Sequence, residues 1–224
     1  MMAAVLPAKA LSLAKERLAS LFSPAERRAL MSAMLGDVLA SVTGARGIDL
    51  VLVVTREPEL VALARGFGAD ICAEPHNLGH TGAVRWALDA LRRRGARAML
   101  TVPGDVPALT SAEVEAMVLA SEPGRSVVFA PSRSGLGTNG VLLRPIDAMD
   151  LRFGEPSFPN HVAAAERAGL RARVLDLPGL GLDIDTPDDV RVLLDLGAGE
   201  RTERVLRETG VAARLAPQGH ARAD

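Results

Sequence analysis

The sequence of 224 residues has one cysteine, Cys72, and no apolar run that approaches the roughly 20 residues of a membrane span. A single cysteine excludes an intrachain disulfide framework and a zinc cluster made of cysteines, and it fits a reducing compartment. The N-terminus also lacks a basic region followed by a long apolar stretch, so we expect neither a signal peptide nor a membrane span. The sequence therefore predicts a cytoplasmic protein.

The charges of the chain are nearly balanced, with 26 lysines and arginines against 27 aspartates and glutamates. Broad binding of nucleic acids or of anionic membranes needs a basic excess, so neither is expected as a partner. Small anionic ligands need only a local group of cations and remain compatible with this balance. The chain also lacks the Gly-x-Gly-x-x-Gly and Walker patterns, which disfavours Rossmann dehydrogenases and P-loop enzymes.

Apolar runs and turn residues divide the chain into alternating strands and helices. The run at 50–55 lacks polar alternation, which is typical of a strand buried on both faces of a parallel sheet. After residue 125 a glycine-rich turn separates two strand-like runs in place of a helix, which predicts an antiparallel excursion. Strands are predicted at 3–6, 50–55, 70–73, 99–102, 126–130, 141–143 and 173–177, and helices at 23–42, 58–67, 81–94, 110–121, 161–168 and from 187 onward.

The length is typical of one domain with a substantial core. In the predicted helix at 81–94, the spacing of Trp86, Leu88 and Leu91 predicts that these side chains face inward. Beyond about Val211 the mixture of alanine, arginine, glycine and proline shows no periodicity. We therefore expect a single α/β domain over 1–210, built on a mainly parallel sheet, and a flexible tail over 211–224.

One acid, Asp105, follows the predicted strand 99–102 and lies between two prolines. Proline cannot donate to a sheet ladder and glycine bends freely, so Pro103 and Gly104 should end the strand just before it. This places a carboxylate at the carboxyl edge of the sheet, where open α/β sheets bind their ligands. A carboxylate in that position is suited to hold a divalent cation against phosphate oxygens.

Two further acids, Asp183 and Asp185, are two positions apart near the end of the chain. In an extended strand both side chains point to the same side, where they could share one magnesium ion with Asp105. The alternative is that Asp185-Thr186-Pro187 is only a helix cap.

Three cations, Lys9, Lys15 and Arg17, follow the first predicted strand and should lie at the same edge of the sheet as Asp105. A triphosphate would need such charges there, so they are candidate phosphate ligands. The alternative, which spacing alone leaves equally open, is a basic face exposed to solvent.

Two glycine-containing loops could surround an anion. The turn 135–140 offers backbone amides and the Thr138 hydroxyl, and the loop 154–157 precedes a predicted helix, whose N-terminus attracts phosphate. A simple hairpin turn explains the first loop equally well. His161 could assist at the second loop, or be a capping or core histidine. His76 and His80 lie in a loop without a frame of metal ligands, so no metal is assigned to them.

Taken together, these segments resemble a known family, the CofC-type guanylyltransferases that make a deazaflavin coenzyme. The resemblance spans most of the chain and rests on five motifs in order. They are Pro7-Ala8-Lys9 with Ala14-Lys15-Glu16-Arg17-Leu18; Gly104-Asp105-Val106-Pro107; Gly137-Thr138-Asn139; Phe153-Gly154-Glu155-Pro156-Ser157-Phe158 with His161; and Leu182-Asp183-Ile184-Asp185-Thr186-Pro187.

The resemblance implies a single-domain nucleotide-diphospho-sugar-transferase-like fold (GT-A, Rossmann-like), which the molybdenum cofactor guanylyltransferases also have. It implies transfer of GMP from GTP to 2-phospho-L-lactate, phosphoenolpyruvate or 3-phosphoglycerate, with release of pyrophosphate. Because the acceptor phosphate is already ionised, such a reaction needs positioning and charge neutralisation more than a general base, and no covalent nucleophile is expected.

The same resemblance assigns residues to roles. The ligands of Mg²⁺ would be Asp105, Asp183 and Asp185. The phosphorylated acid would be held by Thr138, Gly154 and Ser157. Catalysis would rest on Asp105, Lys15 and Lys9. The nucleotide would be contacted by Pro7, Lys9, Lys15, Arg17, Thr81 and Pro103.

One departure from the family pattern lies at Thr81. The segment reads Gly79-His80-Thr81-Gly82-Ala83-Val84 where the family has Gly-Leu-Asn-x-Ala-Leu, so a threonine replaces the asparagine expected near the nucleotide. Two alternatives therefore stay open: a related nucleotidyltransferase with another nucleotide or acceptor, and a non-catalytic nucleotide-binding protein. The sequence identifies neither the three-carbon acid nor the oligomeric state, for which a homodimer stays open.

Overall fold

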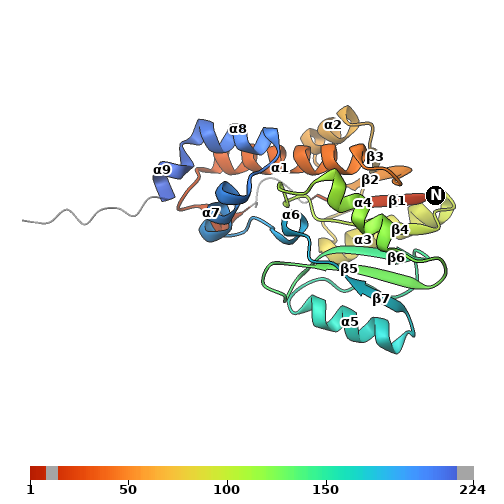
Figure 1. The fold of residues 1–224 in the computed structure, drawn as a ribbon. Coiled ribbons are helices and arrows are strands. Elements are labelled where there is room, and N and C mark those ends of the chain that lie inside the picture. Colours follow the sequence, from red (N-terminus) through yellow and green to blue (C-terminus); the bar gives the residue numbers. More distant parts are fainter. Residues whose placement is uncertain (9–14, 216–224) are drawn as a thin grey trace, which may run out of the picture.

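The computed structural model describes residues 1–8 and 15–215, and its centre is a seven-stranded sheet (Figure 1). The order of the strands across the sheet is β3-β2-β1-β4-β6-β5-β7. Their bounds in that order are Asp70–Cys72, Leu50–Val54, Met2–Pro7, Ala98–Thr101, Thr138–Arg144, Ser126–Pro131 and Arg171–Val174. Among the described residues, no helix is both long and apolar enough to cross a membrane.

Strands β1 to β4 are all parallel, and β6 inserts antiparallel between β4 and β5. Strand β7 then pairs in parallel with β5 at the edge of the sheet. The predicted parallel sheet with an antiparallel excursion after residue 125 is therefore confirmed. Because β6 runs against its neighbours, its first residue, Thr138, lies at the edge where β1 and β4 end.

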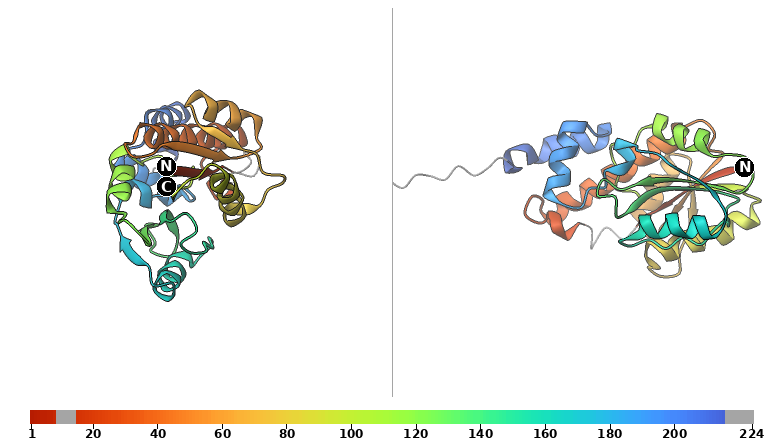
Figure 2. Two further views of the ribbon diagram at one scale, coloured as in Figure 1. Left: turned by 90° about the vertical axis from the view of Figure 1, so that its right-hand side faces the viewer. Right: turned by 60° about the horizontal axis from the view of Figure 1, so that its bottom comes forward.

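The helices lie on both faces of the sheet (Figure 2). One face packs on α1 (Pro24–Gly44), α2 (Pro58–Gly66) and α4 (Ser111–Ala120), and the other on α3 (Gly79–Arg93) and α5 (Ser157–Arg167). Along β1 the buried side chains alternate between the two faces, Leu6 to the first and Val5 to the second. This two-sided burial explains the continuous apolar runs of the central strands.

A third apolar cluster joins α1 to the C-terminal helices α7 (Pro187–Leu196), α8 (Glu200–Thr209) and α9 (Val211–Leu215). The buried carboxylate of Asp37 on α1 accepts hydrogen bonds from the backbone N–H groups of Arg201, at 3.1 Å, and Thr202, at 2.7 Å. It thereby satisfies free donors at the start of α8. The predicted tail boundary is too early, because α9 continues to Leu215 and Val211 is fully buried; 216–224 lie outside the described residues.

Four local predictions are wrong. Trp86 is exposed because its indole N–H reaches out of α3 to donate to the Ala73 carbonyl oxygen at 3.0 Å. Helix α5 begins at Ser157, with Pro156 as its N-cap, and not at the predicted residue 161. Strand β7 spans Arg171–Val174 and not the predicted 173–177. A one-turn helix, α6 (Pro178–Gly181), follows, and the segment 182–186 is not a strand.

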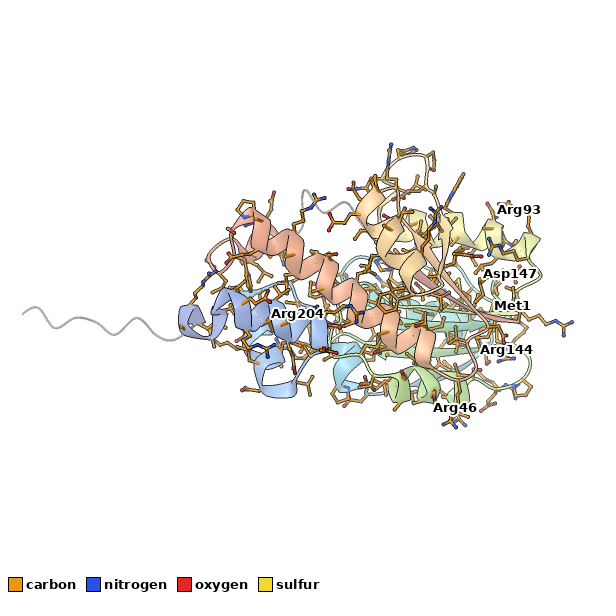
Figure 3. The ribbon with its side chains drawn as sticks, turned by 90° about the horizontal axis from the view of Figure 1, so that it is seen from above. Met1, Arg46, Arg93, Arg144, Asp147 and Arg204 are labelled. Carbon is orange, nitrogen blue, oxygen red and sulfur yellow. The ribbon has the colours of Figure 1, made fainter. Side chains whose placement is uncertain are left out.

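The two ends of the sheet differ in chemistry. Met1, Arg144 and Asp147 lie at the end opposite the C-terminal helices (Figure 3). At the other end, the carboxyl ends of β1 and β4 meet the start of β6, the η2 turn (Glu16–Leu18) and the segment 182–186. All but one of the residues predicted for the site fall at this end, and the exception, Lys9, lies outside the described residues.

Candidate active site

A cavity of 720 Å³ lies at the carboxyl end of the parallel strands. The predicted site residues that line it are Arg17, Thr81, Pro103, Asp105, Thr138, Gly154, Ser157, Asp183 and Asp185. Pro7 lines a hollow of 100 Å³ that shares Pro103 and Asp105 with the cavity, and Lys15 lines one of 250 Å³ that shares Arg17 and Asp185 with it. The structure thus brings the five motif segments to one place.

Asp105 is positioned by the abrupt end of β4. After Thr101 the chain keeps one more bond to β1, from the Val102 N–H to the Val5 carbonyl oxygen at 3.2 Å, and then turns at Pro103 and Gly104. A Cβ at Gly104 would come within 3.0 Å of the Leu35 side chain, so the close approach to α1 favours glycine. The predicted end of the strand just before Asp105 is confirmed.

Lys15 makes the strongest polar contacts of the cavity. Its ammonium donates to Asp105 Oδ2 at 2.5 Å and to Asp185 Oδ1 at 2.6 Å, and only 7% of its side chain is exposed. Its backbone is left-handed, with φ at 58°, which costs a non-glycine residue about 1 kcal/mol. Two short charge-assisted bonds offset this cost.

The pKa values of Lys15 and Asp105 move apart. Burial favours the neutral form of each group, but the opposite charges and the hydrogen bonds between them outweigh it. The pKa of Lys15 is therefore raised and that of Asp105 is lowered. Both groups stay ionised at neutral pH, so the cavity contains a permanent internal ion pair.

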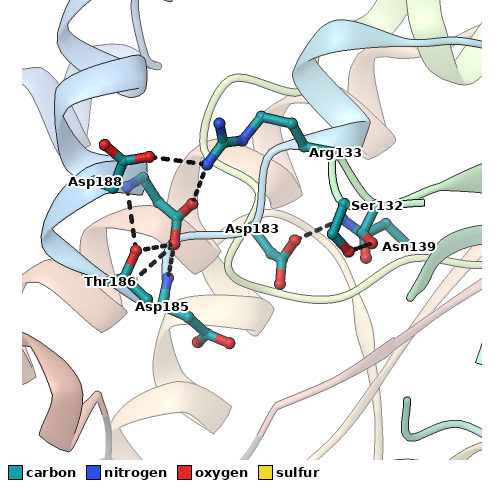
Figure 4. Close-up of polar contacts among 9 residues, drawn as sticks. Ser132, Arg133, Asn139, Asp183, Asp185, Thr186 and Asp188 are labelled. Carbon is teal, nitrogen blue, oxygen red and sulfur yellow. Dashed lines mark hydrogen bonds and ion pairs between the residues drawn. The ribbon is translucent and has the colours of Figure 1, made fainter. Parts of the chain in front are cut away.

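Asp183 is in a different state from Asp105. Burial raises its pKa, and the nearby charges of Asp105 and Asp185 raise it further, against the lowering effect of a hydrogen bond from Asn139. That bond joins Asn139 Nδ2 to Asp183 Oδ1 at 3.0 Å (Figure 4). No lysine or arginine of the described residues forms an ion pair with Asp183. Ionised Asp183 therefore lacks a cation.

The charges of this group test whether a metal ion fits. Asp105, Asp183 and Asp185 carry three negative charges when ionised and Lys15 carries one positive charge, so the net charge of these four groups is −2. Carboxylate oxygens are ligands that Mg²⁺ prefers. In the arrangement described, however, no three His, Cys, Asp or Glu side chains of the described residues are placed to hold a metal. The ammonium of Lys15 lies between two of the acids.

The segment Asp185-Thr186-Pro187 does cap a helix, as the alternative reading of the sequence proposed, but it does so through Thr186 and not through Asp185. Helix α7 is capped by Thr186, whose hydroxyl accepts from the Asp189 N–H at 3.3 Å, while Asp189 accepts from the Thr186 N–H at 2.8 Å. Arg133 donates to Asp189 at 2.8 Å and holds this cap in place (Figure 4). The carboxylate of Asp185 is thus left for Lys15. Although 182–186 is not a strand, Asp183 and Asp185 line the same cavity.

The opposite wall of the cavity is neutral. Thr138 at the start of β6 and Ser157 at the start of α5 are both buried, and their hydroxyl oxygens are 3.1 Å apart. The ring of His161, one turn further along α5, bonds to Thr138 Oγ1 through Nδ1 at 3.0 Å. Burial lowers the pKa of His161, so its ring is neutral at neutral pH. We call these side chains the neutral wall, because they are joined by hydrogen bonds between uncharged groups; Glu155 of the adjacent loop also lines the cavity.

The loop 153–157 connects this wall to α3. The Phe153 N–H donates to the Thr81 hydroxyl at 2.9 Å, and the Phe153 ring centroid lies 4.1 Å from that of His80 and 5.3 Å from that of His161. Gly154 has φ at 112°, a conformation that glycine adopts without strain. Thr81, predicted at the nucleotide, therefore also holds the loop of the neutral wall.

Sequence reasoning assigned no role to Asn139 and left His161 undecided. Asn139 donates to Asp183 and also to the Leu180 carbonyl oxygen at 3.0 Å, so it fixes the segment that carries the acids. The signal available in the sequence was its place in the motif Gly137-Thr138-Asn139, directly after Thr138. Arg17 lines the cavity without an ion pair to a described residue, which leaves it available to an anion.

Comparisons with known proteins agree with this geometry. A family model described as "Guanylyl transferase CofC like" matches residues 2–223. A phosphoenolpyruvate guanylyltransferase of Sphaerobacter thermophilus is 41% identical over 190 residues, which cover 85% of this chain and 91% of that protein. A 2-phospho-L-lactate guanylyltransferase of Methanothermobacter thermautotrophicus is 35% identical over 205 residues, with 92% and 89% covered.

Two solved structures show the fold. A candidate nucleotide-diphospho-sugar transferase from Desulfovibrio desulfuricans aligns with a TM-score of 0.75 at 18% identity, and 96% of each chain is covered. A nucleotidyl transferase from Methanothermobacter thermautotrophicus aligns with a TM-score of 0.62 at 17% identity, covering 93% of this chain and 99% of that one. The expected nucleotide-diphospho-sugar-transferase type of fold is confirmed.

Proposed function

The chain belongs to the CofC-like guanylyl transferases and is a nucleotidyltransferase, and from this premise we propose that it transfers GMP from GTP to the phosphate of a three-carbon phospho-acid. Pyrophosphate is the second product. The acceptor is 2-phospho-L-lactate, phosphoenolpyruvate or 3-phosphoglycerate, and the product enters the synthesis of a deazaflavin coenzyme in the cytoplasm.

The observation that carries this proposal is the division of one 720 Å³ cavity into two walls. The acids on one wall, two of which are bonded to Lys15, suit a nucleoside triphosphate with its metal ion. Neutral hydroxyls beside the start of α5 on the other wall suit a small anion. Two anionic substrates can therefore bind face to face, as direct transfer between them requires.

The reaction is an in-line displacement. A phosphate oxygen of the acid attacks the α-phosphorus of GTP, the bond from that phosphorus to the β-phosphate bridge breaks, and pyrophosphate leaves with the electron pair. Lys15, Arg17 and Lys9 neutralise the phosphates, and Thr138, Gly154 and Ser157 orient the acid. No covalent intermediate with the protein is needed.

We propose that Mg²⁺ binds to Asp105, Asp183 and Asp185 together with the nucleotide. When bound, this ion supplies positive charge to the phosphate oxygens of the nucleotide. Asp105 and Asp185 are held by Lys15 in the described arrangement. A metal ion at these acids would compete with the ammonium of Lys15, which would then be available to the phosphates of GTP.

A second candidate is favoured by one observation at Thr81. Its hydroxyl accepts a bond from Phe153 in the neutral wall, while the family asparagine is expected near the nucleotide. The same fold with another nucleotide, such as CTP, is therefore the alternative. The family assignment favours GTP, and it favours an enzyme over a non-catalytic nucleotide-binding protein.

The test is a pyrophosphate-release assay that crosses GTP, ATP, CTP and UTP with the three acids in the presence of Mg²⁺. Release with GTP and at least one acid, together with a product whose mass is that of GMP joined to the acid, is expected. Release with CTP alone would support the alternative. No release in any combination would overturn the proposed function.

A further inference from the structure

The tautomer of His161 is set by a hydrogen bond from the backbone of Arg152. The Arg152 N–H donates to His161 Nε2 at 3.0 Å, so Nε2 is an acceptor and carries no proton. A neutral imidazole has one proton, which must then be on Nδ1. Burial keeps the ring neutral by lowering its pKa. The Nδ1–H of His161 therefore donates to Thr138 Oγ1, 3.0 Å away.

Thr138 Oγ1 receives a second bond from Ser157, whose hydroxyl donates to it at 3.1 Å. A threonine hydroxyl has two acceptor positions and one proton. Both acceptor positions are now used, so the Thr138 hydroxyl can act toward a further group only as a donor. No acceptor among the described residues takes this proton, although Thr138 is only 6% exposed and lines the cavity.

A second free donor lies beside it at the start of α5, a helix of 11 residues. The Phe158 N–H donates to the Leu136 carbonyl oxygen at 3.0 Å, and Pro159 has no N–H. The N–H of Ser157, which also lines the cavity, has no acceptor within the part of the chain that the structure describes. Two adjacent groups are thus available to donate to the same oxygen or to neighbouring oxygens of a ligand.

We propose that His161 is a positioning residue that makes Thr138 a donor to an anionic oxygen of the phospho-acid. This inference rests on the proposed function and adds a specificity determinant to it. If His161 carried its proton on Nε2, this N–H and the Arg152 N–H would face each other as two donors. Thr138 would then donate its hydroxyl proton to Nδ1 of the ring and could not donate it to a ligand. The ligand selected by this arrangement presents a carboxylate or phosphate oxygen.

The experiment compares matched variants at both positions. Thr138→Val removes the hydroxyl and keeps the shape, and Thr138→Ser restores it. His161→Phe removes both ring contacts, and His161→Asn restores an amide donor near the position of Nδ1. Thr209→Val is the control, because the Thr209 hydroxyl bonds only within α8, to the carbonyl oxygens of Val205 and Leu206.

The readouts are kcat, the KM for the phospho-acid, the Kd for GTP measured by calorimetry, and the melting temperature. Thr138→Val and His161→Phe should each raise the KM for the acid by about tenfold or more, the cost of one lost charged hydrogen bond. The Kd for GTP should stay within twofold of the wild-type value in both. Thr138→Ser and His161→Asn should recover most of the loss.

The outcomes separate the inference from the proposed function. Absence of wild-type activity with every acid overturns both. A wild-type enzyme whose KM for the acid is unchanged in Thr138→Val and His161→Phe overturns only the role of His161. A rise in the Kd for GTP as large as the rise in the KM for the acid would indicate a purely structural role and would also overturn the role of His161. The same conclusion would follow if Thr138→Ser and His161→Asn did not restore the KM for the acid.

Discussion

The proposed function requires each of the two walls of the cavity to bind an anion, and the two walls are built in opposite ways. On the charged wall the ammonium of Lys15 is already paired with Asp105 and Asp185. On the neutral wall a chain of hydrogen bonds from His161 and Ser157 ends in a Thr138 proton that no described residue accepts. Under the proposed function, the charged wall would have to exchange partners to bind its ligand, whereas the donors of the neutral wall are already in place.

The difference follows from the cost of burying charge. An ionised group that is taken out of water without a partner costs several kcal/mol, so Lys15 needs its acids until phosphates replace them. A neutral hydroxyl costs much less, and it can leave one donor unused for a ligand. The charge of Lys15 is thus the reason that the charged wall would exchange partners. The absence of charge on Thr138 is the reason that the neutral wall can be preorganised.

The largest expected effect tests the charged wall. Asp105→Asn keeps the shape of the side chain but removes a charge that both Lys15 and a divalent cation need. We expect kcat/KM for pyrophosphate release to fall by about 10³-fold, as for the loss of a major electrostatic contact in an active site. Asp147→Asn, at the opposite end of the sheet, is the matched control (Figure 3). A variant that keeps a tenth of the activity would contradict this assignment.

The next prediction concerns the exchange at Lys15. Lys15→Met removes the ammonium that bridges Asp105 and Asp185, so turnover should fall by about 100-fold. Binding of Mn²⁺ or Mg²⁺ to the nucleotide-free protein, measured by calorimetry, should become at least about tenfold tighter, because a competing cation is gone. Lys15→Arg keeps the charge and is the control. Metal binding that is unchanged or weaker in Lys15→Met would exclude the exchange.

The parts of this site that could be predicted are those whose interacting residues lie close together in the sequence. The position of Asp105 follows from Pro103 and Gly104 next to it, a local signal that the structure bears out. The bonds from Lys15 span 90 and 170 positions of the chain, and no local pattern contains them. The sequence therefore indicated which residues line the cavity but not that one cation bridges two of the acids.

The fold shows the same limit. The strands and most helices follow from periodicity and capping. The helix predicted at 110–121 is α4, which the capping box of Thr110 and Glu113 begins. The position of α8 depends on a buried Asp37 far away in the chain, and the exposure of Trp86 depends on a single bond to Ala73. Such tertiary contacts override local patterns, and the bond to Ala73 accounts for the wrong prediction at Trp86.

Thr81 provides a prediction at the boundary between the two walls. Thr81→Val removes the oxygen that accepts from the Phe153 N–H, so the loop 153–157 should lose its link to α3. We expect the KM for the phospho-acid to rise by about tenfold, the effect of a lost hydrogen bond with an unpaired donor. The KM for GTP should change less, and Thr81→Ser should behave like the wild type. A rise in the KM for GTP alone would contradict this expectation and would assign Thr81 to the binding of the nucleotide.

The smallest expected effect is at an ion pair outside the cavity. It tests whether the behaviour of the charged wall depends on the burial of its ion pair or on charge alone. Glu26 on α1 pairs with Arg214 on α9 at 2.8 Å, outside the cavity and exposed to water. The hydrogen bond from Arg214, with the bonds to Ser23, lowers the pKa of Glu26 from 4.5 to about 2. A folded-state pKa below the unfolded value means that the pair stabilises the protein above pH 4.5 and that this contribution disappears as the pH falls to about 2.

Glu26→Gln, which keeps a side chain able to complete the capping box with Ser23, should therefore lower the melting temperature slightly at pH 7 and not at pH 2. Added salt should reduce the difference at pH 7, because exposed ion pairs are screened. A difference that persists at pH 2 would assign the effect to hydrogen bonding in place of charge. A small, salt-sensitive effect here beside a large one at Asp105 would show that burial, more than ion pairing itself, commits the charged wall to exchange its partners.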